Sequence, residues 1–257
     1  MKIFNSMFTA FAMYSRLPVR AVEWNEENMR YTMCFVPLIG AVCGVVNVIL
    51  WLILSALHAG NLMYAGLSAC IPLLISGGIH MDGYLDTVDA VASYRTKEKR
   101  LEILKDPHVG SFAVINTGIY FTLMVCAYAS FTDIRTVTAA AFVPVISRCM
   151  GCFMAISVKN ARKEGTLFTF INAADKMKAG VVLVTEWIIV MALSIFAQPF
   201  SGLVLIPAVT ITAYWCYKMA DKRFGGVTGD IIGYTITLLE LTGIIAVMAG
   251  EVLWNLL

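Results

Sequence analysis

Residues 33–57 read MCFVPLIGAVCGVVNVILWLILSAL, an apolar run without a single charged side chain. A helix rises about 1.5 Å per residue, so a run of this length crosses the roughly 30 Å hydrocarbon core of a bilayer. The whole chain has the same character, since 59% of its residues are hydrophobic, 14% are charged and its mean hydropathy is +0.78. This composition excludes a water-facing surface, and a bilayer is the expected solvent.

Six more apolar runs of comparable length follow along the chain. They span residues 61–79, 111–131, 136–157, 179–197, 201–217 and 231–254. The sequence therefore predicts an all-α polytopic membrane protein of about seven transmembrane helices, folded as a single integral-membrane domain over residues 1–257. Residues 1–17 are too polar for a span, because they include Asn5, Ser6 and Arg16, and they predict an N-terminal interfacial or re-entrant helix.

The basic residues give the expected direction of these helices. Of the 19 lysines and arginines, 17 fall on one side, in the N-terminal stretch or in loops at about 80–110, 158–178 and 218–230. Loops rich in lysine and arginine stay in the cytoplasm, so the N-terminus and these three loops are expected there as the active face, with the C-terminus outside. The net charge of +2 gives no reason to expect a nucleic-acid partner.

The stretch from Gly77 to Ala90, GGIHMDGYLDTVDA, follows the second run directly and carries the most informative chemistry. On a helix, Asp82, Asp86 and Asp89 fall within about 60° of one another, where like charges repel. A solvated acidic face is the simplest explanation, but this run is purely acidic and its other face is apolar. A divalent cation explains the column better, because Mg²⁺ takes carboxylate oxygens and shares its remaining sites with phosphate oxygens.

Basic residues downstream of this stretch suit a phosphorylated substrate. Arg95 and Lys105 lie in the same expected loop, and Asp106 follows Lys105 in the segment LKDPHVGS at residues 104–111. Such bases neutralise the phosphate oxygens that a metal ion does not reach. Lipid headgroups also attract cytoplasmic lysines, and for any single lysine that explanation is the simpler one.

A third polar cluster, GGVTGDIIG at residues 225–233, opens the last run. Its glycines, Gly229 included, allow a close backbone approach, and Asp230 stands where a helix begins, with Thr228 as a cap. This helix end would attract an anion, and the carboxylate of Asp230 would reach a cation shared with the acidic stretch. Capping alone is a fair alternative.

Two charges lie deeper in the membrane. Arg148 and Glu240 are each about ten residues from the cytoplasmic end of their runs, roughly 15 Å down. Ionisable groups at this depth are costly unless they are paired. We expect the two residues to pair with each other or to line a polar pocket below the active face, with Glu186 as a weaker partner.

At this point the chain resembles a known family, the adenosylcobinamide-GDP ribazoletransferases, also called cobalamin-5'-phosphate synthases. The resemblance extends over nearly the whole sequence, and GGIHMDG at residues 77–83 is its most specific motif. The matching stretches are SRLP at 15–18, FVPLIG at 35–40, GGIHMDG with Asp86, Thr87 and Asp89, LEILKD at 101–106 before Gly110, Ser147-Arg148, Glu164-Gly165, and GGVTGD at 225–230 with Gly233 and Glu240.

The resemblance implies the closing step of cobalamin nucleotide-loop assembly, carried out in a prokaryotic cell membrane. In that step α-ribazole or its 5'-phosphate displaces GMP from adenosylcobinamide-GDP in a Mg²⁺-dependent reaction. The two substrates and the lipid bilayer are the expected partners. Self-association and association with other enzymes of the pathway are left open.

The chemistry implied by the resemblance assigns roles to the residues singled out above. Asp82, Asp86 and Asp89, joined by Asp230, would hold Mg²⁺, and Asp89 or His80 would take the proton of the attacking hydroxyl. Six further residues are candidates for substrate binding. They are Arg95, Lys105, Asp106, Arg148, Gly229 and Glu240.

Two alternative functions have different sequence requirements. A CDP-alcohol-type membrane phosphotransferase begins its motif with D-x-x-D-G-x-x-A-R, whereas Gly83 follows the first aspartate here and no Ala-Arg pair follows at that interval. A corrinoid transporter would place its acids at the midplane of the membrane, whereas these aspartates crowd the cytoplasmic boundary. Both alternatives rank below the transferase.

Overall fold

A computed structural model describes the chain from residue 2 to residue 256, with side chains from Ile3 onward. The expected domain limits at residues 1 and 257 and the side chain of Lys2 lie outside the described residues. Thirteen helices form in this range, and its only β feature is an isolated bridge between Asn160 and Val227. The helices are α1 (Lys2–Tyr14), α2 (Glu26–Met29), α3 (Thr32–Ala56), α4 (Asn61–Ser76), α5 (Ile79–Ala92), α6 (Lys97–Ile103), α7 (Ser111–Ala129), α8 (Ile134–Ala141), α9 (Val143–Ser157), α10 (Thr166–Ala173), α11 (Lys176–Ala197), α12 (Pro199–Phe224) and α13 (Gly229–Asn255).

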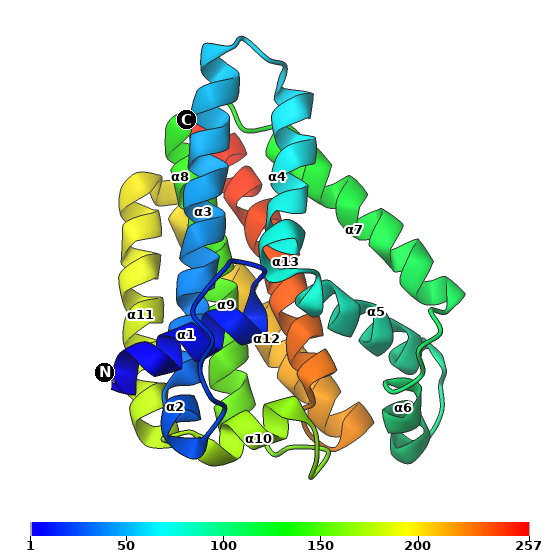
Figure 1. Cartoon of the computed structure of the whole chain (residues 1–257). Helices are drawn as coiled ribbons and strands as arrows, with labels where there is room; N and C mark the ends of the chain where they lie inside the picture. The colour runs from blue at the N-terminus through cyan, green and yellow to red at the C-terminus, as the bar shows by residue number, and fades with distance from the viewer. Residues whose placement is uncertain (1, 257) are drawn as a thin grey trace.

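The expected all-α membrane architecture is confirmed. Six helical segments are long and apolar enough to cross a bilayer, and they become seven when α4 and α5 are taken together as one bent span. The six are α3, α7, α8 with α9, α11, α12 and α13. The N-terminal helix, α1, lies across the lower half of α3 in Figure 1, and its expected place at the membrane interface remains a prediction.

The second expected span differs from the structure at its C-terminal end. The apolar run at 61–79 predicts one straight helix, but α4 ends at Ser76 and the chain turns by 97° into α5. Gly77 and Gly78 make the turn with φ of +68° and +84°, a left-handed conformation that glycine adopts without steric cost. We therefore count α5 outside the spanning segments. The third basic loop is also shorter than expected, because α12 continues as a helix to Phe224.

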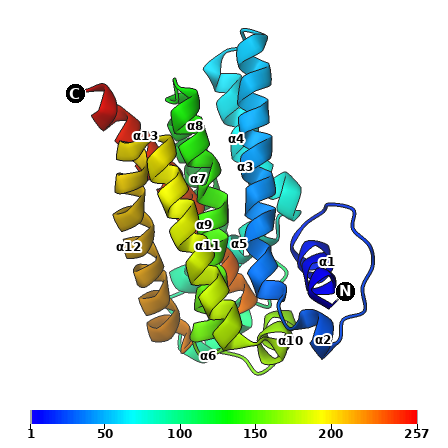
Figure 2. The same cartoon turned by 90° about the vertical axis from the view of Figure 1, so that its left-hand side faces the viewer.

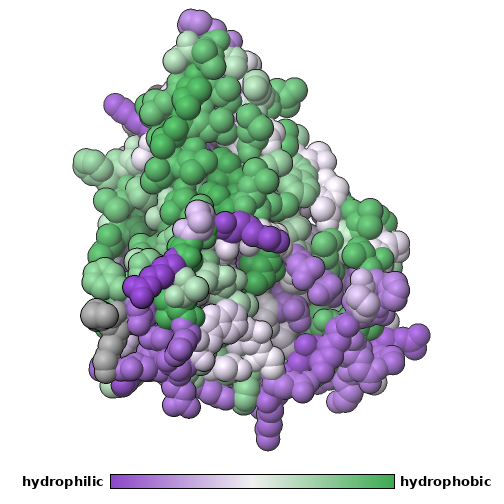
Figure 3. Space-filling model, viewed as in Figure 1, coloured by the Kyte–Doolittle hydropathy of each residue, from purple (hydrophilic) through white to green (hydrophobic). Residues whose placement is uncertain are grey.

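Polar and apolar side chains separate along the long axis of the bundle. Figure 3 shows apolar residues over the upper part and hydrophilic residues gathered at the lower end, where Figure 1 places α2, α6 and α10. Large apolar side chains on α3, α7 and α11 are exposed, among them Ile49, Ile119 and Ile188. Lipid is the surrounding in which such a surface is stable. Figure 2 shows that the C-terminal end of α13 lies away from the polar end.

Two inner helical segments form the centre of the bundle. In α8 with α9 and in α13, 83% and 78% of the apolar stretch is buried, against 22% in α11. The expected pair of deep charges joins these inner segments, since Arg148 Nη1 of α9 lies 2.6 Å from Glu240 Oε1 of α13, and both side chains are buried. Pairing removes most of the cost of holding such charges in hydrocarbon. Glu186 instead accepts a weak hydrogen bond from the thiol of Cys149 at 3.9 Å.

Glycines let α3 approach the inner segment closely. A Cβ atom at Gly40 would overlap the carbonyl oxygen of Pro144, and one at Gly44 would overlap that of Ala141. Small residues at helix contacts are the usual route to tight packing in membranes, because lipid provides no hydrophobic force between helices. By contrast, a Cβ at Gly118 on the outer face of α7 would meet nothing within 4 Å.

Gly44→Ala is expected to destabilise the bundle, whereas Gly118→Ala is its matched control. The added methyl group at residue 44 forces α3 away from α8, at a cost of about 1–3 kcal/mol typical of overpacking. Gly118→Ala should leave stability unchanged or raise it slightly, because alanine is the better helix former. Thermal unfolding of the purified proteins in detergent measures both effects. Equal midpoints for the two variants would show that α3 is not packed as described.

Candidate functional site

Two helices bring the acidic residues together at the polar end of the bundle. Asp82, Asp86 and Asp89 lie on α5, and Asp230 lies in the first turn of α13. The helices cross with their backbones almost in contact, because a Cβ atom at Gly83 would lie 2.6 Å from the carbonyl oxygen of Asp230. At the neighbouring turn, a Cβ at Gly233 would lie 3.0 Å from the carbonyl oxygen of His80. The expected proximity of Asp230 to the acidic stretch follows from these two glycines.

The carboxylates at this crossing share one region of negative charge. Burial, followed by the charges of Asp82, Asp230 and Asp89, raises the pKa of Asp86 to about 7, and Arg162 opposes the rise. Aspartate normally titrates near 4, so the folded protein holds Asp86 partly protonated at neutral pH. An arrangement of this kind is expected to take up a cation.

Asp89 also makes hydrogen bonds that connect two helices. Its two carboxylate oxygens accept the backbone N–H groups of Gly110, at 2.6 Å, and Ala113, at 2.9 Å. These donors belong to the start of α7, where N–H groups have no partner within the helix. Gly110 has room for this contact only because it lacks a Cβ, which would lie 2.7 Å from the carboxylate. Asp89 therefore fastens α7 to α5.

Among the described residues, Arg162 is the one basic side chain that an ion pair joins to the acidic cluster, and no motif in the sequence singles it out. Its Nη1 lies 3.7 Å from Asp230 Oδ2, and its Nη2 donates a hydrogen bond to the carbonyl of Leu101. The loop that carries it is fixed to the start of α13 by two hydrogen bonds of 2.9 Å, Ala161 N–H to Val227 O and Val227 N–H to Lys159 O. Nothing in the local sequence signals this bridge, since the two residues that it joins, Asn160 and Val227, lie more than sixty residues apart.

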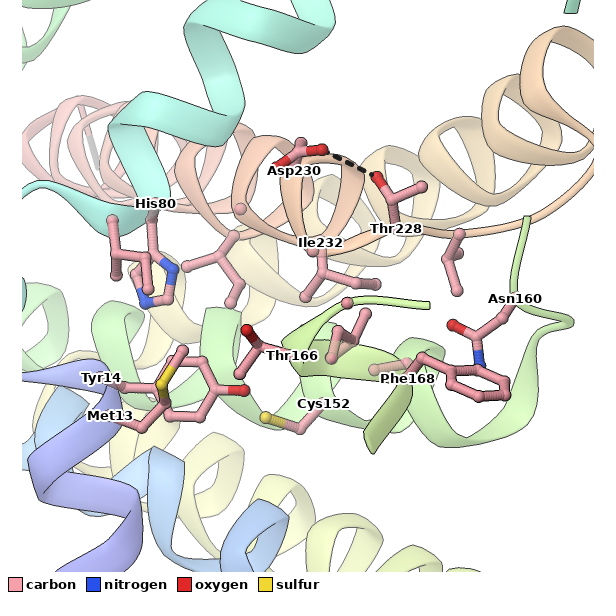
Figure 4. A pocket seen from close by; sticks show the side chains of 18 of the residues that line it. Met13, Tyr14, His80, Cys152, Asn160, Thr166, Phe168, Thr228, Asp230 and Ile232 are labelled. Carbon is pink, nitrogen blue, oxygen red and sulfur yellow. Dashed lines mark hydrogen bonds between the residues drawn. The ribbon is translucent and has the colours of Figure 1, made fainter. Parts of the chain in front are cut away.

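A cavity of about 250 Å³ opens beside the acidic cluster (Figure 4). It lies between α1, the start of α5, the end of α9, α10 and the start of α13. Its polar lining residues include Asp82, Asn160, Arg162, Thr228 and Asp230. Met13, Met33, Ile79 and Ile232 contribute apolar surface, and Tyr14 and Phe168 contribute aromatic rings.

His80 is a buried polar side chain of this cavity. Only 7% of it is exposed, and its Nε2 has no hydrogen-bond partner within residues 2–256. Its ring lies nearly parallel to that of Tyr14, with ring centroids 6.4 Å apart and an angle of 20° between the planes. Burial, helped by the charge of Arg148, lowers the pKa of His80 to about 3, so the imidazole is neutral.

The structure distributes the other candidate residues over three places. Gly229 lines the cavity with His80, Asp82 and Asp230, and Lys105 reaches its edge through a 2.5 Å ion pair with Glu164. Arg95 is exposed in the loop after α5, and Asp106 is exposed where it accepts the N–H of His108 at 3.0 Å. Arg148 and Glu240 are buried against each other and are not among the residues that line the cavity.

The carboxylates suit a magnesium ion that completes its shell with other oxygens. Among the described residues, no group of three or more histidine, cysteine or acidic side chains is placed so that it could hold a metal ion by itself. Mg²⁺ does not need one, because it usually binds one or two protein carboxylates and keeps waters and substrate phosphates as its remaining ligands. Asp82, Asp86 and Asp230 supply oxygen donors alone, which agrees with that preference.

The chain is similar over nearly its whole length to one group of known proteins. The sequence model of a family described as cobalamin-5-phosphate synthase matches residues 6–248. A protein of Lachnoclostridium phytofermentans, named adenosylcobinamide-GDP ribazoletransferase, is 42% identical over 255 residues, which cover 98% of this chain and 96% of that protein. A protein of the same name from Clostridium botulinum is 30% identical and covers 94% of this chain and 96% of its own length. No solved structure matches the chain.

The raised pKa of Asp86 predicts how stability depends on pH. Between about pH 4 and pH 7 the unfolded chain has lost the Asp86 proton that the folded chain keeps, so the free energy of unfolding falls as the pH rises. In Asp86→Asn this contribution is absent, and the fall with pH should be shallower. Thermal midpoints measured from pH 4.5 to 8, without divalent cations, provide the comparison.

Asp133→Asn is the matched control for this titration. Asp133 caps the start of α8 from an exposed position, and asparagine caps helices equally well. This variant should follow the wild-type pH dependence. If the thermal midpoint of Asp86→Asn fell with pH as steeply as that of the wild type, the shared negative charge at the crossing would be contradicted.

Proposed function

The chain belongs to the cobalamin-5-phosphate synthase family, and from that membership we propose that the cavity and the acidic crossing of α5 and α13 form its active site. The protein is an adenosylcobinamide-GDP ribazoletransferase and acts in the final stage of cobalamin assembly. Neither a CDP-alcohol phosphotransferase nor a corrinoid transporter is favoured. The observation that carries the placement of the site is the convergence of Asp82, Asp86 and Asp230 beside a cavity that Arg162 also lines.

We further propose that the reaction releases GMP and depends on Mg²⁺. A ribose hydroxyl of α-ribazole or its 5'-phosphate attacks the phosphorus atom next to the cobinamide. The bond from that phosphorus to the bridging oxygen breaks, and GMP leaves with the electron pair. Bound Mg²⁺ supplies neutralisation of the diphosphate charge. Such a transfer needs positioning and charge neutralisation more than covalent catalysis, and the acidic crossing with Arg162 offers the groups for both.

The protein residues have distinct proposed parts in this step. Asp82, Asp86, Asp89 and Asp230 are the carboxylates that would hold the metal, and the guanidinium of Arg162 would face the oxygens of the diphosphate. Lys105 lies at the edge of the same cavity, paired with Glu164, and is a candidate for a further phosphate contact. The proposed acceptors of the hydroxyl proton are Asp89, whose oxygens each hold one backbone N–H, and His80, whose Nε2 is without a partner in the described chain.

The carboxylates are tested by turnover of the purified protein. In detergent or liposomes, the wild type with adenosylcobinamide-GDP, α-ribazole 5'-phosphate and Mg²⁺ should release GMP in step with a new corrinoid product, and EDTA should stop the reaction. Asp82→Asn and Asp86→Asn should each lower kcat/KM at least about 100-fold, equivalent to about 2.7 kcal/mol of transition-state stabilisation. Chromatography of nucleotides and corrinoids gives both rates.

Asp133→Asn again serves as the control, because Asp133 is exposed and caps a different helix, α8. It should turn over at the wild-type rate. Near-normal turnover of Asp82→Asn and Asp86→Asn would show that the metal-binding proposal is wrong, even if the transferase activity itself is present.

The polar end of the bundle is proposed to face the cytoplasm, with the C-terminus outside. Tyr94 beside the acidic helix is 86% exposed, and Leu57 at the opposite end is 70% exposed. Single cysteines at these positions, in a background with exposed Cys70 and Cys126 replaced by serine, report the direction. An impermeant maleimide should label Leu57→Cys in intact cells, and Tyr94→Cys only after permeabilisation. The reverse pattern would invert the topology.

A further inference from the structure

We propose that the cavity beside the acidic crossing is the subsite for the ribazole substrate, with its bicyclic base held between apolar side chains, Tyr14 and His80. This inference rests on the proposed function and deepens it, because it assigns one of the two substrates to one part of the site. The corrinoid substrate then stays outside the cavity and presents only its diphosphate to the carboxylates.

The size of the cavity distinguishes the two substrates. An enclosed apolar space of about 150 Å³ holds a benzene molecule, so one of about 250 Å³ suits a small bicyclic ring with part of a sugar. A corrin macrocycle with its side chains is several times larger. The polar end of the cavity, with Arg162 and Asp230, adjoins the acidic crossing, so a nucleoside bound base-first would leave its ribose hydroxyls there.

The end of the cavity away from Arg162 and Asp230 has a lining that suits ribazole better than the guanosine of the other substrate. Met13, Tyr14 and Cys152 face this space with Ile232 and His80 (Figure 4). Guanine carries several donors and acceptors on its edge, and each would need a partner once buried. The base of ribazole, a dimethylbenzimidazole, has one free ring nitrogen and two methyl groups. A mainly apolar space with few polar groups, such as this end of the cavity, is complementary to it.

His80 supplies a polar contact for the free nitrogen of the base. Of the described residues that line the cavity, His80 alone has a buried side-chain polar atom without a partner, its Nε2. A neutral imidazole protonated at Nε2 donates one hydrogen bond, which is what the free nitrogen of the base accepts. This assignment gives His80 a binding role and leaves Asp89 as the proposed proton acceptor.

Tyr14 is held in place by contacts that connect α1 with the rest of the site. Just after it, the backbone N–H of Arg16 donates to the carbonyl of Ile75 at the end of α4, at 2.8 Å. The side chain of Arg16 packs directly against Gly77. A Cβ atom at residue 77 would lie only 2.4 Å from Arg16 Nε and would overlap it, so the contact requires glycine. The ring of Tyr14 also meets the edge of Phe170, with centroids 6.4 Å apart. The N-terminal helix thus closes one wall of the cavity.

Binding measured without turnover tests the subsite. Equilibrium dialysis of α-ribazole against the purified full-length protein, without adenosylcobinamide-GDP, gives the dissociation constant. Tyr14→Leu should raise it about 10-fold, through lost aromatic contact, and His80→Ala about 5-fold, through one lost hydrogen bond. His80→Gln keeps an N–H donor and should recover most of the loss. Tyr94→Leu, at an exposed loop tyrosine, is the matched control and should bind as the wild type does.

The variants should raise the KM for ribazole and leave the KM for adenosylcobinamide-GDP unchanged, and GMP should not displace bound ribazole. Unchanged ribazole binding in Tyr14→Leu, with a raised KM for adenosylcobinamide-GDP, would assign the cavity to guanosine and overturn the inference. A fall in kcat alone for His80→Ala would make His80 the proton acceptor and not a binding residue. Phe168→Leu, on a half-buried lining residue, repeats the test if Tyr14→Leu does not fold.

These outcomes separate the inference from the proposed function. A wild type that releases no GMP refutes the proposed function, whatever the dialysis shows. A wild type with normal turnover, whose ribazole affinity is indifferent to Tyr14, Phe168 and His80, refutes only the subsite.

Discussion

The close crossing of α5 and α13 is the contact on which the site depends. At Gly83 and Gly233 the two backbones come nearer than any pair of side chains would permit. The crossing places carboxylates of like charge side by side, which is unfavourable in itself. Other contacts hold the helices together against this repulsion. Tyr84 and Tyr234 stack across the crossing with ring centroids 5.4 Å apart and 10° between their planes, and Asp89 fastens α5 to α7.

The buried ion pair of Arg148 and Glu240 holds α13 from its other side. The pair joins α9 to α13, and Arg148 Nη1 also donates to the carbonyl of Pro144 at 2.8 Å. Removing one partner of such a pair leaves an uncompensated charge and typically costs about 3–5 kcal/mol. A substrate role for these two residues stays a proposal. Their evident contribution is to fix the rotation of α13, and with it the direction in which Asp230 points.

The sequence was sufficient for features that repeat along one helix or one loop. Apolar runs predicted the spans, and the spacing of Asp82, Asp86 and Asp89 predicted a single acidic face. Pairing of Arg148 with Glu240 was one of the two arrangements that the sequence left open, because a membrane leaves deep charges few alternatives. The remaining features depend on residues far apart in the chain. No local sequence pattern indicates the bridge that brings Arg162 to Asp230 or the contact of Tyr14 with His80. The 97° turn was also missed, because the apolar run at 61–79 continues through the glycines that make it.

That turn explains how a membrane protein builds a site for water-soluble substrates without a separate soluble domain. α4 ends about half-way down the bundle in Figure 1, and a straight continuation would carry Asp86 and Asp89 roughly 15–20 Å beyond the end of α4. Because Gly77 and Gly78 turn the chain, α5 instead runs across the bundle and meets the first turn of α13 at Gly83. Its apolar face packs against α7 and α13 through Tyr84 and Met81, while its acidic face stays open to the aqueous side. The spanning helices then serve as the rigid support of the site, and the cavity that α1 closes on one side lies next to its carboxylates.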